Sequence, residues 1–206
     1  MPKTFEEAYK VLRRDPVMRQ IIKQTGPMKP RKVEKDVYGA LLRSVTGQQL
    51  SVKAAATIHG RFLDLFPSRN PAPKLLLKMS LEKLRAAGLS MQKASYLKSV
   101  AEQATMGNLE FKSINALDDE ALIQLLTGIK GIGVWSAQMV MMFALQRPDV
   151  FPVGDLGIQQ SMRLQYGIKA EGKTLTKEME LLSSIWKPHR TLASLHLWAV
   201  KDAGEK

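Results

Sequence analysis

Apolar residues recur every three or four positions along most of the chain, which is the spacing of one face of an α-helix. After Ser51 the apolar residues with this spacing are Val52, Ala55, Ala56, Ile58, Phe62, Leu63 and Phe66. A second stretch, after Ser90, repeats the spacing with Tyr96, Leu97 and Val100. No segment shows the convincing alternation of apolar and polar residues that a half-buried strand requires. The pattern predicts an all-α fold of about ten helices with short connections.

Residues that favour the first position of a helix open most of these segments. The expected helix starts are Thr4, which forms a capping box with Glu7, and Asp15, Asp36, Ser51, Ser80, Ser90, Asp118 and Thr176. Glycines stand where helices have to end, at Gly26, Gly88, Gly128 and Gly167. The stretch from Pro67 to Pro73 is expected to be a loop.

The chain, residues 1–206, is expected to form one domain with two helical lobes. The first lobe spans about residues 33–106, and the second combines about residues 1–32 with residues 107–206. We place the boundary in the polar connection from Asn108 to Leu117, which leads into the helix expected at Asp118.

The charge balance adds a partner to this picture. Against 19 Asp and Glu the chain carries 31 Lys and Arg, a net charge of +12, which predicts a strongly positive surface. Nucleic acid is then the first partner to consider and an acidic membrane surface the second. The N-terminus lacks the apolar core of a signal peptide, and no apolar run reaches membrane-spanning length. We therefore expect no membrane partner and a cytoplasmic, nucleoid-associated protein in a bacterium, or a nuclear one in a eukaryote.

The chain contains no cysteine, which excludes disulfides, thiolate zinc sites and cysteine-ligated iron–sulfur clusters. The three histidines, His59, His189 and His196, lack the spacing of metal ligands. No cofactor is expected to be required.

A tight turn between two helices is the most informative feature of the sequence. It lies in a hairpin at residues 127–137, where Gly131 and Gly133 bracket an apolar residue, Ile132, that anchors the turn in the core. Amides at the start of the following helix then form an anion site suited to a DNA phosphate. The expected contacts of this site are Lys130, Gly131, Ile132, Gly133 and Val134.

The other side of such a hairpin presents backbone carbonyls. Those of Thr127, Ile129 and Gly131 are candidates for holding a structural monovalent cation, Na⁺ or K⁺.

The run from Ile129 to Ala137 closely resembles the helix-hairpin-helix signature of the DNA glycosylase superfamily. That family places an essential aspartate shortly after the following helix, where this chain has Phe151 to Ile158. Two further blocks, Thr46 to Ala55 and Trp186 to Trp198, resemble the alkylpurine branch, 3-methyladenine DNA glycosylase II.

The resemblance implies a monomeric, monofunctional glycosylase of base excision repair. It would flip an alkylated purine, such as 3-methyladenine or 7-methylguanine, from duplex DNA into a cleft between the lobes and leave an abasic site. It also implies a compact form without the N-terminal β-rich domain of longer bacterial members.

Asp155 is the expected catalytic residue, and it also stands at the N-cap of a helical segment from Leu156 to Tyr166. A helix N-terminus stabilises the ionised carboxylate. Cleavage of an N-glycosidic bond develops positive charge on the sugar, which a fixed carboxylate stabilises while it orients the attacking water. Because an alkylated purine already carries positive charge, its departure needs no second carboxyl group as an acid.

Bifunctional relatives carry a lysine nucleophile two residues after the second hairpin glycine, where this chain has Trp135. We therefore expect no lyase activity. Trp135 and Trp198 are candidate walls of the base pocket, where an indole face attracts a cationic base by roughly 0.5–2 kcal/mol. Met139, one turn after Trp135, is a third pocket candidate and an alternative core residue.

A flipped nucleotide leaves a gap in the duplex that a side chain has to fill. Gln49 and Leu50 occupy the loop where the family carries its intercalating wedge, and Gln49 is the closer match.

Two other functions remain open. A non-catalytic helix-hairpin-helix module explains the charge and the hairpin, but gives Asp155 and the tryptophan motifs no task. A glycosylase for oxidised, deaminated or etheno bases is the second alternative, and Trp135 counts against only its bifunctional form.

Overall fold

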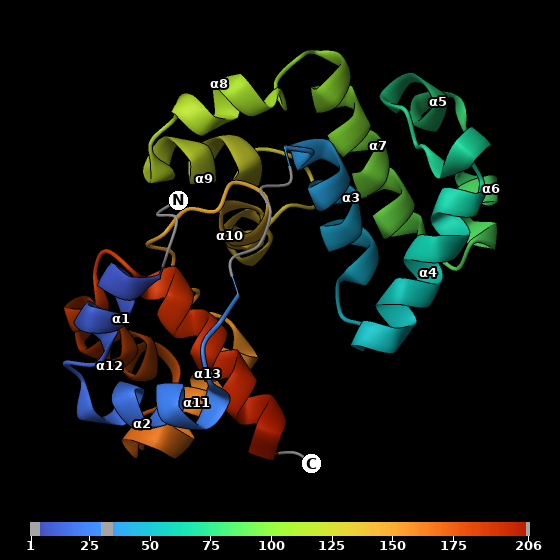
Figure 1. Ribbon diagram of the computed structural model, residues 1–206. Coiled ribbons are helices and arrows are strands. Elements are labelled where there is room, and N and C mark those ends of the chain that lie inside the picture. Colours follow the sequence, from blue (N-terminus) through green and yellow to red (C-terminus); the bar gives the residue numbers. More distant parts are fainter. Residues whose placement is uncertain (1–4, 30–34, 205–206) are drawn as a thin grey trace. The chain divides into compact units, whose positions relative to one another are not determined.

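The computed structural model describes residues 5–29 and 35–204. Within this part of the chain the regular elements are thirteen α-helices and two short 3-10 helices, without strands (Figure 1). This confirms the all-α fold, although the helices outnumber the expected ten or so. The chain divides into two compact units: unit 1 combines Met1–Val33 with Met141–Lys206, and unit 2 is Glu34–Val140.

Unit 1 is built from helices that come from both ends of the sequence. They are α1 (Glu6–Leu12), α2 (Pro16–Thr25), α11 (Leu156–Tyr166), α12 (Gly172–Ser183), the 3-10 helix η2 (Ser184–Trp186) and α13 (Arg190–Gly204). The last helix, α13, packs against both α2 and α11. The N-terminal and C-terminal segments therefore share one core.

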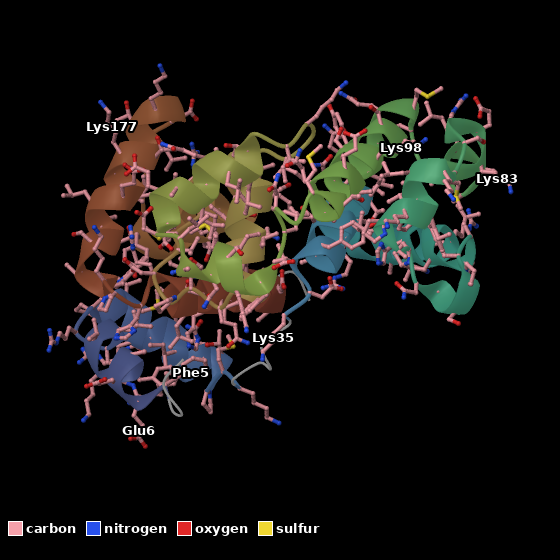
Figure 2. The ribbon with its side chains drawn as sticks, turned by 90° about the horizontal axis from the view of Figure 1, so that it is seen from above. Phe5, Glu6, Lys35, Lys83, Lys98 and Lys177 are labelled. Carbon is pink, nitrogen blue, oxygen red and sulfur yellow. The ribbon has the colours of Figure 1, made fainter. Side chains whose placement is uncertain are left out.

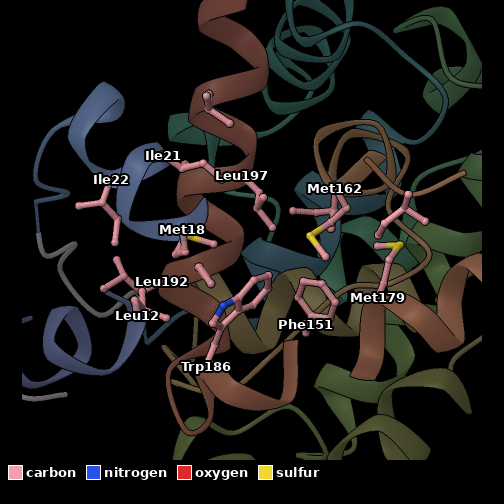
Figure 3. Close-up of a cluster of buried hydrophobic side chains, with 14 of the residues drawn as sticks. Leu12, Met18, Ile21, Ile22, Phe151, Met162, Met179, Trp186, Leu192 and Leu197 are labelled. Carbon is pink, nitrogen blue, oxygen red and sulfur yellow. The ribbon is translucent and has the colours of Figure 1, made fainter. Parts of the chain in front are cut away.

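Trp186 is a fully buried member of that core (Figure 3). Its ring meets the ring of Phe151 edge to face, with centroids 5.6 Å apart, and its Nε1 donates a hydrogen bond of 2.9 Å to Oδ2 of Asp15. The hydroxyl of Tyr166 donates to the same oxygen over 2.6 Å. Asp15 is buried, and these bonds provide the partners that a buried carboxylate requires.

Unit 2 is arranged around α7 (Met91–Thr105), which packs against α3, α5 and α6. The other elements that begin in this unit are α3 (Val37–Gly47), α4 (Val52–Asp64), η1 (Pro67–Arg69), α5 (Pro73–Lys78), α6 (Leu81–Ala86), α8 (Phe111–Ala116), α9 (Asp119–Thr127) and α10 (Val134–Phe143). Because the boundary falls after Val140, the last turn of α10 belongs to unit 1.

The expected helix starts are confirmed for six residues whose side chains accept a backbone N–H of the first turn: Asp15, Asp36, Ser51, Ser80, Ser90 and Asp118. The start expected at Thr4 lies outside the described residues. The start expected at Thr176 is wrong, because α12 already begins at Gly172. The hydroxyl of Thr176 instead donates to the carbonyl of Lys173 within that helix.

One lobe boundary differs from the expectation. Residues 107–140 belong to unit 2 together with α3 to α7, and the division falls inside α10 and not between Asn108 and Leu117. The physical reason is that the turn after α9 packs on α7: a side chain at Gly131 would collide with the ring of Tyr96.

Lysines such as Lys83 and Lys177 extend from the ribbons of the two units (Figure 2), and both are exposed. In the described part of the chain, no helix combines the length and the apolar composition that crossing a membrane requires.

Candidate active site and hairpin

Asp155 ends a short turn and begins α11. The turn is closed by two backbone bonds, from Val153 N to the Phe151 carbonyl over 3.0 Å and from Asp155 N to the Pro152 carbonyl over 2.9 Å. Oδ1 of Asp155 accepts the backbone N–H of Ile158 over 2.9 Å, which confirms the expected N-cap. The carboxylate is therefore fixed at the positive end of an eleven-residue helix.

Trp198, on α13, holds the same carboxylate oxygen. Its Nε1 donates a hydrogen bond of 2.8 Å to Oδ1 of Asp155, and its ring stacks on that of Phe143 with centroids 6.1 Å apart and planes inclined by 26°. Trp198 was expected only as a pocket wall. In unit 1 it also orients the proposed catalytic group, and Phe143 is an aromatic neighbour that the sequence did not single out.

Gly157 makes room for this pair. A Cβ atom at Gly157 would lie 3.1 Å from Oδ1 of Asp155 and 3.1 Å from Cδ1 of Trp198, closer than ordinary contacts. A larger residue would push the carboxylate and the indole apart. In the sequence, the sign of this close packing is the glycine two residues after Asp155.

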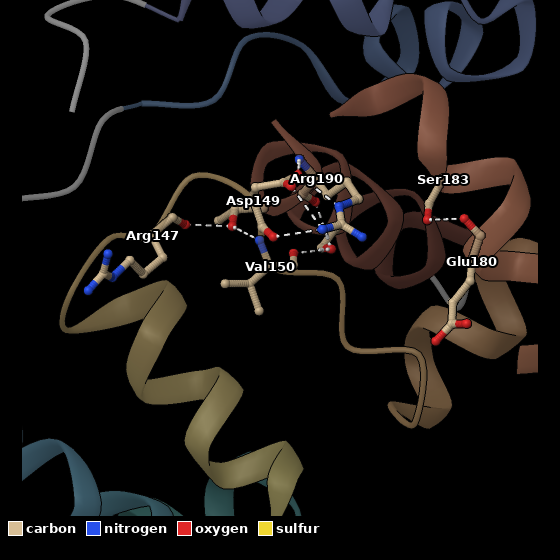
Figure 4. Close-up of polar contacts among 8 residues, drawn as sticks. Arg147, Asp149, Val150, Glu180, Ser183 and Arg190 are labelled. Carbon is tan, nitrogen blue, oxygen red and sulfur yellow. Dashed lines mark hydrogen bonds and ion pairs between the residues drawn. The ribbon is translucent and has the colours of Figure 1, made fainter. Parts of the chain in front are cut away.

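The chain before Asp155 is fastened to the start of α13 (Figure 4). The guanidinium of Arg190 donates from Nε to Oδ1 of Asp149 and from one terminal nitrogen to Oδ2, each over 2.8 Å. The hydroxyl of Thr191 donates to the Arg147 carbonyl over 2.6 Å and accepts the N–H of Val150 over 2.9 Å. The segment that leads to Asp155 and the start of the helix that carries Trp198 are thus tied together.

Burial by itself would raise the pKa of Asp149, but the hydrogen bonds from Arg190 outweigh it and hold that pKa below its ordinary value. Asp149 is therefore a stable anion that keeps Arg190 in place. No motif in the sequence marked this pair, because its members are 41 positions apart.

The hairpin between α9 and α10 belongs to unit 2 and has the expected anchor. Ile132 is buried, and its N–H donates to the carbonyl of Ile129 over 3.0 Å. Gly131 has φ of 92°, and a Cβ there would lie 2.1 Å from Cγ of Tyr96. Only glycine satisfies both the backbone and the packing at this position.

Gly133 stands in contrast, because nothing lies within 4 Å of the place where its Cβ would be. Val134 and Trp135, which begin α10, are 54% and 42% exposed, and Lys130 is exposed as well. The start of α10 is thus open to a large anionic partner. Met139, one turn after Trp135, is partly buried.

The wedge candidates also lie in unit 2, between α3 and α4. Gln49 has φ of 57°, in the left-handed region that residues other than glycine seldom adopt. Gln49 is exposed and Leu50 is 37% exposed. Both side chains are accessible to a partner.

The proposed cation ligands include two carbonyls with hydrogen-bond donors. The Ile129 carbonyl accepts the N–H of Ile132, and the Gly131 carbonyl accepts Nε2 of Gln48 over 2.9 Å. Each carbonyl oxygen has a second lone pair, so the donor set is compatible with a monovalent cation. Thr127, the third ligand, ends α9 and directs its hydroxyl to the Ile123 carbonyl.

Two of the three histidines, His196 and His59, have hydroxyl partners for their rings. His196 is buried, with Nδ1 2.6 Å from the hydroxyl of Thr25 and Nε2 3.3 Å from that of Tyr9. Nδ1 of His59 lies 3.0 Å from the Thr46 hydroxyl. Across the described residues, no three His, Asp or Glu side chains gather as metal ligands do.

A cavity of about 290 Å³ lies elsewhere in unit 1. It is mainly apolar, and its lining includes Phe5, Ala8, Met142, Phe143, Leu192 and Leu195. Asp155 and Trp198 are not part of its lining. Phe143 therefore stacks on Trp198 and also borders this cavity.

Comparison with known proteins places these features in a family. Residues 42–188 match the HhH-GPD superfamily of base excision DNA repair proteins, and the chain belongs to this superfamily. It is 37% identical over 185 residues to DNA-3-methyladenine glycosylase 1 of Schizosaccharomyces pombe, covering 87% of this chain and 80% of the relative. A putative DNA-3-methyladenine glycosylase of Bacillus subtilis is 30% identical over 175 residues, which is 82% of this chain and 60% of that protein.

Solved structures agree with this assignment. The 3-methyladenine DNA glycosylase of S. pombe in complex with abasic DNA superposes with a TM-score of 0.87 at 33% identity, over 95% of this chain and 97% of that one. A DNA-3-methyladenine glycosidase from Bacillus halodurans gives 0.82 at 35% identity, over 97% and 91% of the two chains.

Proposed function

We propose that this protein is a monofunctional DNA glycosylase that hydrolyses the N-glycosidic bond of alkylated purines in duplex DNA and leaves an abasic site. The observation that carries the proposal is the carboxylate of Asp155, fixed by the Ile158 amide and the Trp198 indole in a member of a base excision repair superfamily. Two relatives bear the name 3-methyladenine glycosylase, and a similar enzyme was solved with abasic DNA, the product of such a reaction.

Asp155 would act on the sugar and not on the base. As the bond from C1′ to the purine lengthens, positive charge develops on the deoxyribose, and a preorganised carboxylate stabilises it. The electrons of the breaking bond go to the purine, whose positive charge they neutralise. Water then adds to C1′ and loses a proton, which Asp155 accepts directly or through solvent.

The hydrogen bonds to Oδ1 matter because they orient the carboxylate before the reaction begins. Ile158 and Trp198 supply two donors from different elements, a helix amide and an indole. A group held in this way needs little reorganisation when the charge develops.

Hydrolysis without lyase chemistry follows from the residue at the start of α10. Trp135 is 42% exposed at the position where bifunctional relatives carry a lysine. An indole cannot form the Schiff base that a lyase step requires. The aromatic faces of Trp135 and Trp198, with Met139 near the former, would instead contact the extruded cationic base.

No cofactor enters this reaction. We propose that a monovalent cation at the carbonyls of Thr127, Ile129 and Gly131 would strengthen phosphate binding by the hairpin, because it adds positive charge beside the amides of α10. Affinity for undamaged duplex in NaCl, KCl and tetramethylammonium chloride at equal ionic strength tests this. Weaker binding in tetramethylammonium alone supports the cation, and equal binding in all three salts contradicts it.

The central experiment measures free base released from methylated duplex DNA, with alkali added afterwards to reveal abasic sites. The wild type is expected to release 3-methyladenine and 7-methylguanine, with strand cleavage only after alkali. A non-catalytic binding module would release no base, a lyase would cleave before alkali, and a glycosylase for deaminated bases would act on hypoxanthine alone.

Asp155→Asn tests the proposed residue. Asparagine caps helices about as well as aspartate, so the variant is expected to fold and to bind abasic-analogue DNA, yet to lose base release by roughly 10²–10³-fold or more. Asp118→Asn is the matched control, because Asp118 caps α9 through the same kind of bond to Ala121 N. Near wild-type turnover in the Asp155 variant would end the assignment.

A further inference from the structure

Residues 48–50, which include the two wedge candidates, form a segment that we call the wedge loop. It follows α3 directly, where helix carbonyls lose their partners within the helix. Nζ of Lys93, on α7, donates to the carbonyl of Thr46 over 3.0 Å and to that of Gln48 over 2.7 Å. One ammonium group thus binds the carbonyls on both sides of Gly47, at the negative end of a helix where a cation is stabilising.

A second side chain joins the wedge loop to the hairpin. Nε2 of Gln48 donates to the Gly131 carbonyl over 2.9 Å, across 83 positions of sequence. Gly131 packs in turn against Tyr96, which lies on α7 one turn after Lys93. The wedge loop and the phosphate-binding turn therefore rest on the same helix and are bonded to each other.

The backbone conformation directly after Gln48 is unfavourable. Gln49 has φ of 57°, in the left-handed region that is unfavourable for a residue with a side chain. Such a conformation persists when its surroundings hold it. Here the flanking residue Gln48 is held twice, by its carbonyl and by its amide side chain.

Neither Lys93 nor Gln48 is placed to fill the duplex gap as exposed Gln49 is, since both are partly buried and engaged with backbone carbonyls. Burial also lowers the pKa of Lys93. Lys93 and Gln48 therefore order the wedge loop. A loop that is ordered before binding loses less conformational entropy when DNA binds.

We propose that Lys93 and Gln48 are positioning residues for base flipping, which hold the wedge loop in a fixed place relative to the phosphate-binding hairpin. The inference rests on the proposed function. When the hairpin binds a backbone phosphate, Gln49 then meets the base stack at a set distance from it. Loss of either residue leaves phosphate binding and the chemistry of Asp155 intact but makes extrusion of a paired base slower.

The first experiment needs no DNA. Lys93→Met keeps the length of the side chain and removes the ammonium group, and amide hydrogen exchange reports the order of the wedge loop. Exchange of the Leu50 amide, which donates to the Gly47 carbonyl over 3.3 Å, is expected to accelerate by roughly tenfold, because the charged donor that holds the neighbouring carbonyls is lost. The matched control is Lys98→Met: Lys98 (Figure 2) lies on the same helix, and its Nζ donates to the Leu77 carbonyl, away from the loop.

The second experiment separates flipping from chemistry. Single-turnover excision of 7-methylguanine is measured for the base paired with cytosine and for the base opposite an abasic site, where extrusion costs less. Lys93→Met and Gln48→Met are expected to slow the paired substrate by roughly tenfold and the unpaired one by much less. Lys98→Met is expected to match the wild type on both.

Three results would overturn the proposal. One is unchanged exchange in the wedge loop of Lys93→Met, and another is equal slowing on both substrates. The third is weaker binding of undamaged duplex with a salt dependence reduced by about one phosphate, which would make Lys93 a direct DNA contact. Because the exchange measurement uses protein alone, it also distinguishes failure of this coupling from failure of the glycosylase assignment.

Discussion

For Asp155 and Trp198, the sequence predicted the identity of the site residues but not the contact between them. Both were identified by the motifs around them, and the N-cap role of Asp155 followed from its place before a helical segment. Their mutual hydrogen bond was not predictable, because it joins positions 43 apart on different helices. The same holds for the stacking of Trp198 on Phe143 and for the space that Gly157 provides.

The two roles of Trp198 can be separated by two substitutions. Trp198→Phe removes the Nε1 donor and keeps a ring, so excision of charged 7-methylguanine and of neutral hypoxanthine is expected to slow by a similar factor, about tenfold. Trp198→Ala also removes the aromatic face. Discrimination in favour of the charged base is then expected to fall by a further threefold to thirtyfold.

Single-turnover rates on both substrates measure these effects free of slow product release. Wild-type rates in Trp198→Phe would show that the bond to Asp155 does not serve catalysis. Equal losses for the two bases in Trp198→Ala would show that Trp198 selects by shape and not by charge.

His196 makes the stability of the protein sensitive to acid. Burial lowers its pKa to about 4, whereas a histidine in an unfolded chain titrates near 6.5. Between these values the unfolded chain binds more protons, so the free energy of unfolding falls as the pH falls from about 6.5 to 4. The loss from this residue approaches about 3 kcal/mol.

Urea unfolding at several pH values tests this prediction with His196→Gln, which is expected to show a shallower decline over that window. His189→Gln, at a partly exposed position, is the control and should follow the wild type. Parallel curves for the wild type and His196→Gln would remove His196 as the source of the acid sensitivity.

At the scale of elements, the hairpin offers two glycines with opposite roles. Gly131→Ala places a Cβ against Tyr96 in a left-handed backbone and is expected to destabilise the fold by about 2–4 kcal/mol. Gly133→Val meets no neighbour, so stability is expected to change by only about 1 kcal/mol. Its side chain would, however, block close approach of a phosphate and weaken duplex binding by roughly tenfold or more.

Denaturant unfolding and duplex titration of both variants check this contrast. A folded Gly133→Val protein with wild-type affinity would exclude the hairpin as the phosphate site.

Helices were predictable from sequence where a capping side chain marked their start, as at Asp36 and Ser90. The six-residue helices α5 and α8 begin after Ala72 and Glu110 without a side-chain cap and are too short to show periodicity. The helix start predicted at Thr176 was wrong because threonine hydroxyls also bond to carbonyls inside a helix. Local chemistry therefore predicted most elements, and α5, one of the exceptions, packs against α7.

At the scale of the whole molecule, the sequence predicted two units but not where the second boundary falls. The hairpin joins unit 2 through contacts of Gly131 with Tyr96 and Gln48, and these contacts span 35 positions or more. The polar stretch from Asn108 to Leu117 resembles a linker in the sequence, but in the structure it lies within unit 2. Unit 1 combines both ends of the chain, as the second lobe was expected to, but its C-terminal part begins at Met141 and not near residue 107.

Net charge acts on the whole molecule and leads to a prediction that separates binding from chemistry. With a charge of +12, the protein is expected to release several counterions when it binds undamaged duplex, so that affinity falls about 10³-fold between 50 and 200 mM salt. The single-turnover rate at saturating enzyme should change little, because the contacts among Asp155, Ile158 and Trp198 lie within hydrogen-bond distance, well inside the screening length. Fluorescence anisotropy measures the first quantity and quenched base release the second. Salt-independent affinity would refute the electrostatic interface, and a rate that falls in parallel with affinity would mean that long-range charge, and not the local geometry around Asp155, drives the chemical step.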